Sequence, residues 1–186
     1  MIVEEFLGAV VSRLQQLERR ELLLVVSSYL LRQREITHEF DEQYDEGIEA
    51  ILLRSLELAR KSSDSSQSVS REQLSAAADE AMEAAPDSDD YSDHLSLYTQ
   101  NAMASCYYLL KYCLDDDFSD AKTSIEKLLE TVDALNVVKS RDETAAFGYE
   151  CGVLELILNA LKEATPGGDA SFSDMQIVAL HSPIQR

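Results

Sequence analysis

The stretch Leu95–Leu114 constrains the fold more than any other part of this chain of 186 residues. Apolar side chains recur along it at helical spacing on two sides, with Ala102 and Cys106 on one side and Met103 and Leu110 on another. A helix that is apolar all round has to be covered all round. The sequence therefore predicts a central helix that is buried among other helices.

The rest of the chain shows apolar residues at every third or fourth position, a spacing that is typical of amphipathic helices. Besides the central one, this spacing predicts helices over about residues 2–16, 18–35, 44–59, 70–85, 119–135 and 140–164. No stretch shows the sustained alternation of apolar and polar residues that a half-buried strand requires. We therefore expect an all-α fold, a single compact bundle of about seven helices.

Segments of low apolar content separate the predicted helices. The serine-rich stretch Ser62–Ser70 carries too few apolar residues to pack, so we expect a mobile loop there. Pro166 and the two glycines after it end the last helix. The expected organisation is one helical domain over residues 1–168 and a C-terminal tail over residues 169–186. In the tail, the sequence DMQIVAL is apolar enough to dock on the domain.

Several predicted helices begin at residues whose side chains are suited to cap the first turn. Ser70 with Gln73 three positions later has the spacing of a capping box, and Ser140 begins a second such pattern. Either Asp117 or Ser119 is placed to cap the helix that follows the aspartates at positions 115–117. We interpret these aspartates as a solvated connection between helices.

The chain is strongly acidic. Thirty-five acidic residues stand against sixteen basic ones, which gives a net charge of −19. A field of this sign repels nucleic acid and anionic membrane surfaces and attracts basic protein surfaces. We therefore expect a basic protein partner, with no binding to nucleic acid and none to a membrane.

The cysteines and the apolar runs indicate where the protein resides. Cys106, Cys113 and Cys151 make an odd number, unlike the dense, even sets of small secreted scaffolds, so we interpret them as reduced core thiols. Glutamates occupy the N-terminal region where a secretory signal needs positive charge. The longest apolar run, Leu22–Leu31, is about half as long as a membrane span. We expect a soluble, cytoplasmic protein.

The sequence contains few patterns that are typical of metal sites. Glu35 and His38 have the i, i+3 spacing seen in di-iron bundles, but that architecture needs the pair twice and the sequence has it once. The stretch Asp87–Asp93 alternates acids as a calcium loop does, but it lacks the central glycine and the closing glutamate. Phosphate-binding loops, dinucleotide motifs and nucleophile elbows are absent from the sequence. We therefore predict no metal, no cofactor and no catalytic residue.

Gly148 and Gly152 lie four positions apart in a predicted helix. Each glycine costs about 1 kcal/mol relative to alanine in a helix interior, so some other interaction should offset the cost. The expected interaction is close packing against a neighbouring helix. A surface for a partner is the alternative.

Several stretches together resemble one bacterial family. They are RLQQLERRELLLVVSSYLLRQ, AAPDSDDYSDHLSLYTQNAMASCYYLL and DAKTSIEKLLETVDAL, and the resemblance covers about residues 8–138. Its most specific part is the turn into the central helix, with Pro86, Asp89, Asp90, Tyr91, Tyr98, Asn101 and Ala102. The chain thus resembles the YjaG-like family of unknown function, domain-of-unknown-function family 416. This resemblance implies a compact, all-helical cytosolic fold and no established catalytic residues.

We hypothesise a non-enzymatic protein-binding protein whose acidic surface engages a basic partner. A bacterial immunity protein that neutralises a basic toxin would be of this kind, because acidic inhibitors use such fields to speed association. The predicted binding surface consists of Asp41, Glu42, Asp45, Glu46, Glu49, Asp87, Asp89, Asp90 and Asp93.

Two alternatives remain open at this point. One is a small-ligand-binding protein or enzyme with a pocket beside the central helix, lined by Tyr98, Asn101, Ser105 and Tyr108. These residues belong to the part of the helix that carries most of its polar side chains. The other alternative is a helical protein that associates with itself into a homo-oligomer.

Overall fold

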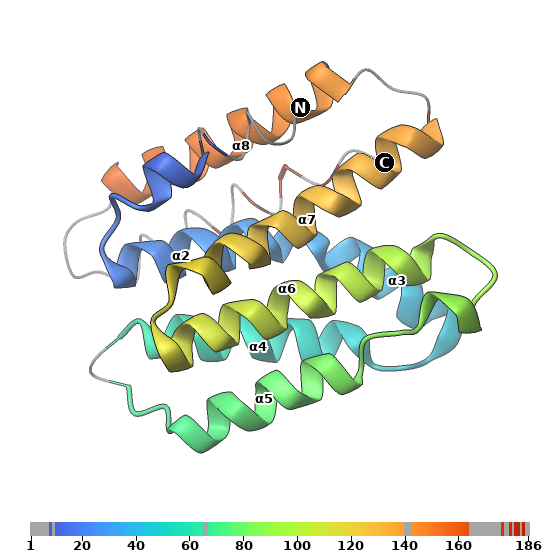
Figure 1. The fold of residues 1–186 in the computed structure, drawn as a ribbon, viewed down its shortest axis with the longest axis horizontal. Helices are drawn as coiled ribbons and strands as arrows, with labels where there is room; N and C mark the ends of the chain where they lie inside the picture. Colours follow the sequence, from blue (N-terminus) through green and yellow to red (C-terminus); the bar gives the residue numbers. More distant parts are fainter. Residues whose placement is uncertain are drawn as a thin grey trace.

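The computed structural model describes residues 8, 10–64, 67–139 and 143–163, together with positions 176, 179, 181, 182 and 184. This part of the chain contains no strand. Residues 10–14 are helical, and they are followed by α2 (Arg19–Leu30), the 3-10 turn η1 (Leu31–Gln33), α3 (Arg34–Tyr44), α4 (Ile48–Ser62), α5 (Arg71–Glu83), the 3-10 turn η2 (Ser88–Asp90), α6 (Leu95–Asp115), α7 (Phe118–Lys139) and α8 (Glu143–Glu163). The predicted all-α fold class is confirmed, and Figure 1 shows α2 to α8 packed as a bundle. Among the described helices, none combines the length and apolar content that a membrane crossing would require.

Helix α6 is the centre of the bundle. It contacts α2, α3, α4, α5 and α7, and in Figure 1 it lies between α7 on one side and α4 and α5 on the other. Ala102, Met103, Cys106, Leu109 and Leu110 are completely buried, although they point to different sides of the helix. The prediction of a buried central helix is confirmed.

The buried cysteines behave as core thiols. Cys106 and Cys113 on α6 are buried and free, and Cys151 on α8 is free and half-buried. Burial raises the pKa of the Cys106 thiol to about 12 and that of Cys113 to about 11. Both thiols are therefore protonated and unreactive at neutral pH.

The boundary predicted near residue 35 was wrong. The chain bends at η1, but it continues as α3 to Tyr44, and the next helix begins only at Ile48. Ile36 and Phe40 are buried and lie four positions apart, so they hold α3 against the bundle. Charged residues separate these apolar positions, and the narrow stripe that results was not recognised as helical from the sequence.

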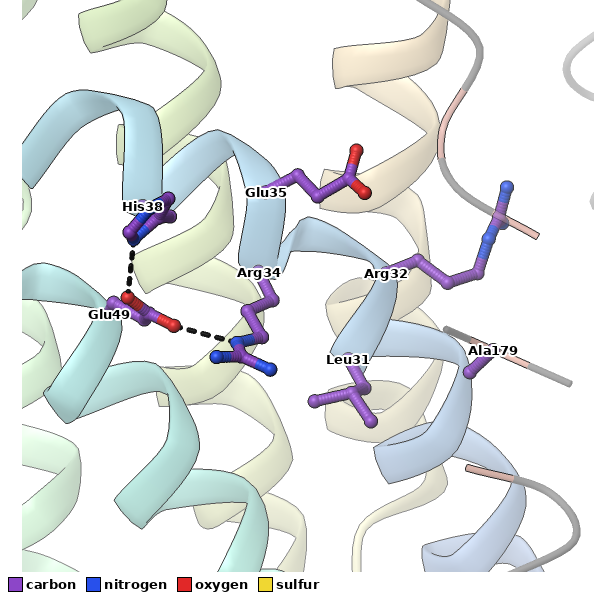
Figure 2. A pocket seen from close by; sticks show the side chains of 7 residues that line it. All are labelled: Leu31, Arg32, Arg34, Glu35, His38, Glu49 and Ala179. Atoms are coloured by element: carbon purple, nitrogen blue, oxygen red, sulfur yellow. Dashed lines mark hydrogen bonds and ion pairs between the residues drawn. The ribbon is translucent and has the colours of Figure 1, made fainter. Parts of the chain in front are cut away.

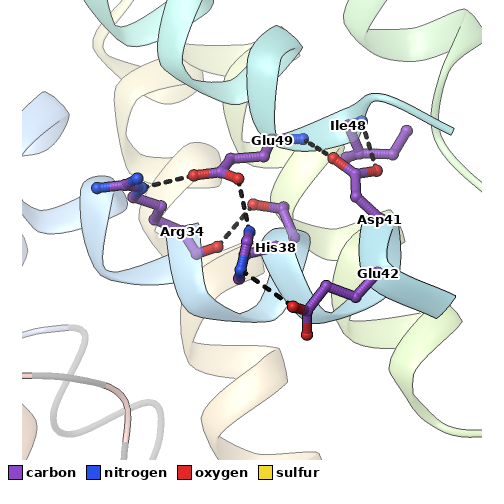
Figure 3. Close-up of polar contacts among 7 residues, drawn as sticks. Arg34, His38, Asp41, Glu42, Ile48 and Glu49 are labelled. Atoms are coloured by element: carbon purple, nitrogen blue, oxygen red, sulfur yellow. Dashed lines mark hydrogen bonds and ion pairs between the residues drawn. The ribbon is translucent and has the colours of Figure 1, made fainter. Parts of the chain in front are cut away.

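A tight turn at residues 45–47 reverses the chain between α3 and α4. Asp45 has φ of 57° and Gly47 has φ of 76°, both in the left-handed region that glycine and aspartate tolerate best. The carboxylate of Asp41 accepts hydrogen bonds from the backbone N–H groups of Ile48 at 2.7 Å and Glu49 at 2.8 Å (Figure 3). Asp41 lies one turn before the end of α3. Its carboxylate therefore accepts hydrogen bonds from backbone N–H groups of the first turn of α4, which have no partner within that helix.

Two of the predicted helix caps are present. The Ser70 hydroxyl accepts a hydrogen bond from the backbone N–H of Gln73 at 3.2 Å, and the Gln73 side chain accepts one from the Ser70 N–H at 2.9 Å. Before α7, the carboxylate of Asp117 accepts the Ser119 N–H at 2.9 Å, so the first of the two candidates is the cap. Ser140 lies outside the described residues.

The expectation of close packing at Gly148 and Gly152 was wrong. A Cβ atom added at either position would meet no other atom within 4 Å. Helix α8 instead packs against α2 and α7 through its opposite side, where Phe147, Leu154 and Leu158 are buried. The two glycines lie on the exposed side of α8, and their cost in helix stability is not offset by a helix of the described chain.

The two segments predicted to be irregular are described only in part. Residues 65 and 66 of the serine-rich stretch lie outside the described residues, and the predicted mobility of this stretch stays a prediction. In the C-terminal tail, Ala179 and Ile184 are buried in the core, and Ala179 belongs to the DMQIVAL sequence that was expected to dock. The division of the chain at residue 168 also stays a prediction, because residues 164–175 are outside the described part.

Candidate functional site

The two acidic segments predicted to form a binding surface meet at one end of the bundle. The Tyr44 hydroxyl donates a hydrogen bond to Asp93 at 2.7 Å, and the Gln43 amide donates one to the same oxygen at 2.9 Å. The rings of Phe40, Tyr44 and Tyr91 lie with centroids 4.7 to 5.2 Å apart and join α3 to the turn before α6. Acidic residues about 45 positions apart in sequence thus belong to one surface.

Four of the nine predicted acids are engaged in holding this end together. Asp41 caps α4, as described above. Asp93 accepts the N–H groups of Leu95 and Ser96 at the start of α6, and the hydrogen bond from Tyr44 lowers the pKa of Asp93. The remaining two are Asp87, which accepts the Asp89 N–H at 3.0 Å, and Glu49, which pairs with basic residues of α3.

The other five acids are exposed, and we call them the acidic end: Glu42, Asp45, Glu46, Asp89 and Asp90. Glu42 lies 3.6 Å from a ring nitrogen of His38. The Glu46 carboxylate is close to Tyr91 and, together with burial, raises the pKa of its hydroxyl. In the part of the chain that the structure describes, no basic side chain forms an ion pair with Asp45, Asp89 or Asp90.

The opposite end of α6 is also acidic in sequence, but basic side chains pair with two of its aspartates, Asp115 and Asp116. Asp115 pairs with Lys111 at 2.6 Å and with Arg71 at 2.8 Å, and both cations lower the pKa of its carboxyl group. Asp116 pairs with Arg19 at 2.9 Å. The two ends lie about 30 Å apart along the helix axis, so the basic side chains that pair with Asp115 and Asp116 do not reach the acidic end.

A small pocket of about 180 Å³ lies between α3, α4 and position 179 (Figure 2). Its lining consists of Leu31, Arg32, Arg34, Glu35, His38, Glu49 and Ala179. Figure 2 shows Glu49 between His38 and Arg34, with the Glu35 carboxylate pointing away from them.

Three charged side chains of this pocket, Arg34, His38 and Glu49, form one cluster. Glu49 accepts a hydrogen bond from the Arg34 Nε at 2.6 Å and lies 2.8 Å from the His38 Nδ1 (Figure 3). The described residues that line the pocket include no hydroxyl or thiol that could act as a nucleophile. Among the described residues there is also no group of three histidine, cysteine, aspartate or glutamate side chains that could hold a metal ion. The contacts of Glu49 with Arg34 and His38 connect α4 to α3.

The contact with Glu49 predicts the direction in which the pKa of His38 is shifted. Glu49 raises the pKa of the imidazole, first by its hydrogen bond and then by its charge. The protonated form is therefore favoured in the folded protein. Its stabilisation is fully present below the ordinary histidine pKa of about 6.5 and is lost as the pH rises through the raised value.

Replacing Glu49 by glutamine should lower the pKa of His38 back toward its ordinary value, as followed by NMR of the imidazole ring protons. The matched control is Glu42→Gln, which should shift the pKa less because Glu42 lies 3.6 Å away from His38. An unchanged His38 titration in the Glu49→Gln variant would contradict the assigned contact.

The pocket predicted beside α6 is present only in part. An open hollow of about 460 Å³ lies there, and Asn101 and Tyr108 line it. Tyr98 and Ser105, the other two predicted residues, are buried and do not line the hollow. The four predicted residues are therefore not brought together, and the described hollow contains no acid–base pair beside a nucleophile that would support catalysis.

A buried ionic network is the feature that sequence reasoning missed. The Arg32 guanidinium pairs with both carboxylate oxygens of Glu150 on α8, with the second contact at 2.8 Å. The Tyr29 hydroxyl donates to the same carboxylate at 2.6 Å, and the Arg32 Nε donates to the Ser182 carbonyl oxygen at 2.6 Å. Both charged side chains are buried, at 0% and 1% exposure, and the network joins α2, α8 and the C-terminal segment.

The sequence did contain a signal for this network. Glu150 lies three positions after Phe147 and four before Leu154, so it shares their buried side of the helix. A charge on a buried side has to find a partner of opposite charge. Arg32, at the end of the apolar run of α2, was the natural candidate.

The fold and these sites define an all-α bundle with one unneutralised acidic end. No family model matches the chain, and the searches found neither a curated protein nor a solved structure that is similar to it. The resemblance to the YjaG-like family stays a prediction. Function therefore has to be inferred from the residues themselves.

Proposed function

We propose that this chain is a non-enzymatic protein-binding protein that engages a basic partner through the acidic end. The observation that carries the proposal is the contrast between the two ends of α6. Arg71, Lys111 and Arg19 pair with Asp115 and Asp116 at one end, whereas Asp45, Asp89 and Asp90 have no basic partner in the described chain. Unpaired surface charges of one sign favour association with a surface of the opposite sign.

The specific form that we propose is a bacterial immunity protein that neutralises a basic toxin. The net charge of −19 adds a long-range field to the local charges of the acidic end. Such a field raises the rate at which a basic protein is captured and hardly affects a neutral one. Fast capture is what an inhibitor of an intracellular toxin requires, and no catalytic chemistry is needed for it.

The test compares two variants with equal charge removed. The first, Asp45→Asn with Asp89→Asn and Asp90→Asn, neutralises the unpaired acids. Asparagine tolerates the left-handed conformation at position 45, so the turn should be retained. The control, Glu72→Gln with Asp120→Asn and Asp133→Asn, removes three charges on α5 and α7.

Immobilised wild-type protein and both variants would be used to capture partners from cells of the source organism. The captured protein would be identified by mass spectrometry, and its association rate with each form would then be measured. We expect the first variant to associate about tenfold more slowly at low salt and the control to behave like wild type. A partner that binds all three forms equally, or whose binding does not change between about 50 and about 500 mM salt, would contradict the proposal.

A further inference from the structure

The open hollow beside α6 adjoins the acidic end. It lies between the C-terminal part of α5, the turn before α6, and the facing sides of α6 and α7, which contact one another along their lengths (Figure 1). Asp87 lines it and belongs to the same turn as Asp89 and Asp90. Met82 and Ala104 contribute apolar side chains to its lining, and Tyr108 contributes an aromatic ring.

Asn101 gives the hollow an unused hydrogen-bonding group. Its side chain lines the hollow, and the residue is only 7% exposed. No hydrogen bond joins its carboxamide to another residue of the described chain. The oxygen and nitrogen of its carboxamide are not among the fully buried polar atoms that lack a partner, so they are accessible from the hollow. The carboxamide is therefore available to a ligand that enters the hollow.

One acidic and one basic side chain line the hollow, Asp87 and Lys127. One oxygen of Asp87 accepts the Asp89 N–H, which leaves the second oxygen free to accept another donor. Lys127 also lines the hollow, but both carboxylate oxygens of Glu130 hold its ammonium group, at 2.7 and 2.8 Å. The charge of Lys127 is thus neutralised by its neighbour, and that of Asp87 is not.

We propose that this hollow receives a guanidinium group, namely one arginine side chain of the basic partner. The planar guanidinium has five donors, enough to bond the free oxygen of Asp87 and the carboxamide oxygen of Asn101 together. The ring of Tyr108 offers a face for the guanidinium, and Met82 and Ala104 contact its aliphatic stem. Lysine, a point charge with no planar face, fits this set of partners less well. The inference rests on the proposed function and adds the anchor of the interface.

The first experiment uses arginine with acetylated and amidated ends as the probe, followed by NMR. We expect it to shift the signals of the Asn101 side-chain amide and the Tyr108 ring. Asp87→Asn retains the acceptor for the Asp89 N–H and should weaken binding about tenfold. Asn101→Leu should also weaken it, and the same probe built on lysine should bind more weakly than the arginine probe. The control Asp120→Asn on α7 should leave binding unchanged.

The second experiment separates this inference from the proposal on which it rests. If the captured partner binds Asp87→Asn and Asn101→Leu like wild type, but loses binding to the variant of Asp45, Asp89 and Asp90, the anchor is wrong and the acidic end stands. If all these variants bind like wild type, both are wrong. Free arginine that binds at least tenfold more tightly than the capped probe would also overturn the inference, because the hollow would then be a site for a free amino acid.

Discussion

Replacing Arg32 by methionine should lower the free energy of unfolding by about 3–5 kcal/mol. The guanidinium is fully buried and bonds both oxygens of Glu150, so its removal leaves a carboxylate in the core without a counter-charge. Urea unfolding followed by circular dichroism would measure the loss of stability, since the chain has no tryptophan.

Two further variants show whether burial of the charge is the cause. The triple variant Tyr29→Phe, Arg32→Met and Glu150→Leu removes the whole network, and it should be more stable than Arg32→Met alone. Arg54→Met breaks an exposed ion pair with Glu80 and should cost at most about 1 kcal/mol. An Arg32→Met variant that is no less stable than Arg54→Met would mean that the pair is not buried in solution.

Replacing Leu109 by alanine should cost about 2–5 kcal/mol of unfolding free energy. The side chain is completely buried in α6, which contacts five other helices of the bundle. Its neighbours belong to several elements, so they cannot all move to fill the space that the lost methyl groups leave. The same urea experiment would measure the change.

The control is a leucine of α8 that lies at the surface. Leu156 is 53% exposed, and Leu156→Ala should change the unfolding free energy by no more than about 0.5 kcal/mol. If Leu109→Ala cost as little as Leu156→Ala, α6 would not be the central element of the core.

Some elements could be predicted from the sequence because the cause is local. The apolar sides of α6 identify a buried helix whatever its neighbours are, and Ser70 and Gln73 form their capping box within four residues. The limits of α3 could not be predicted in this way. Phe40 and Tyr44 of α3 pack against Tyr91 from a distant turn, and this contact depends on the tertiary structure.

The roles of the acidic residues in the candidate site could not be predicted from the sequence either. The sequence showed which residues are acidic. It did not show which carboxylates are already engaged in hydrogen bonds or ion pairs within the protein. Asp41 and Asp93 cap helices, whereas Asp45 and Asp89 have no basic partner in the described chain. Those differences depend on helix starts and on side chains that lie far away in the sequence.

By itself the sequence determined the all-α class, the buried central helix and the acidic character of the surface, because helical periodicity and net charge are properties of the chain alone. Only the tertiary structure decided where the negative charge remains. Arg19 reaches Asp116 across 97 positions and Arg71 reaches Asp115 across 44, so these two aspartates are paired, whereas Asp45, Asp89 and Asp90 have no basic partner in the described chain. The physical reason is that an ion pair depends on distance in space, which packing sets and sequence separation does not.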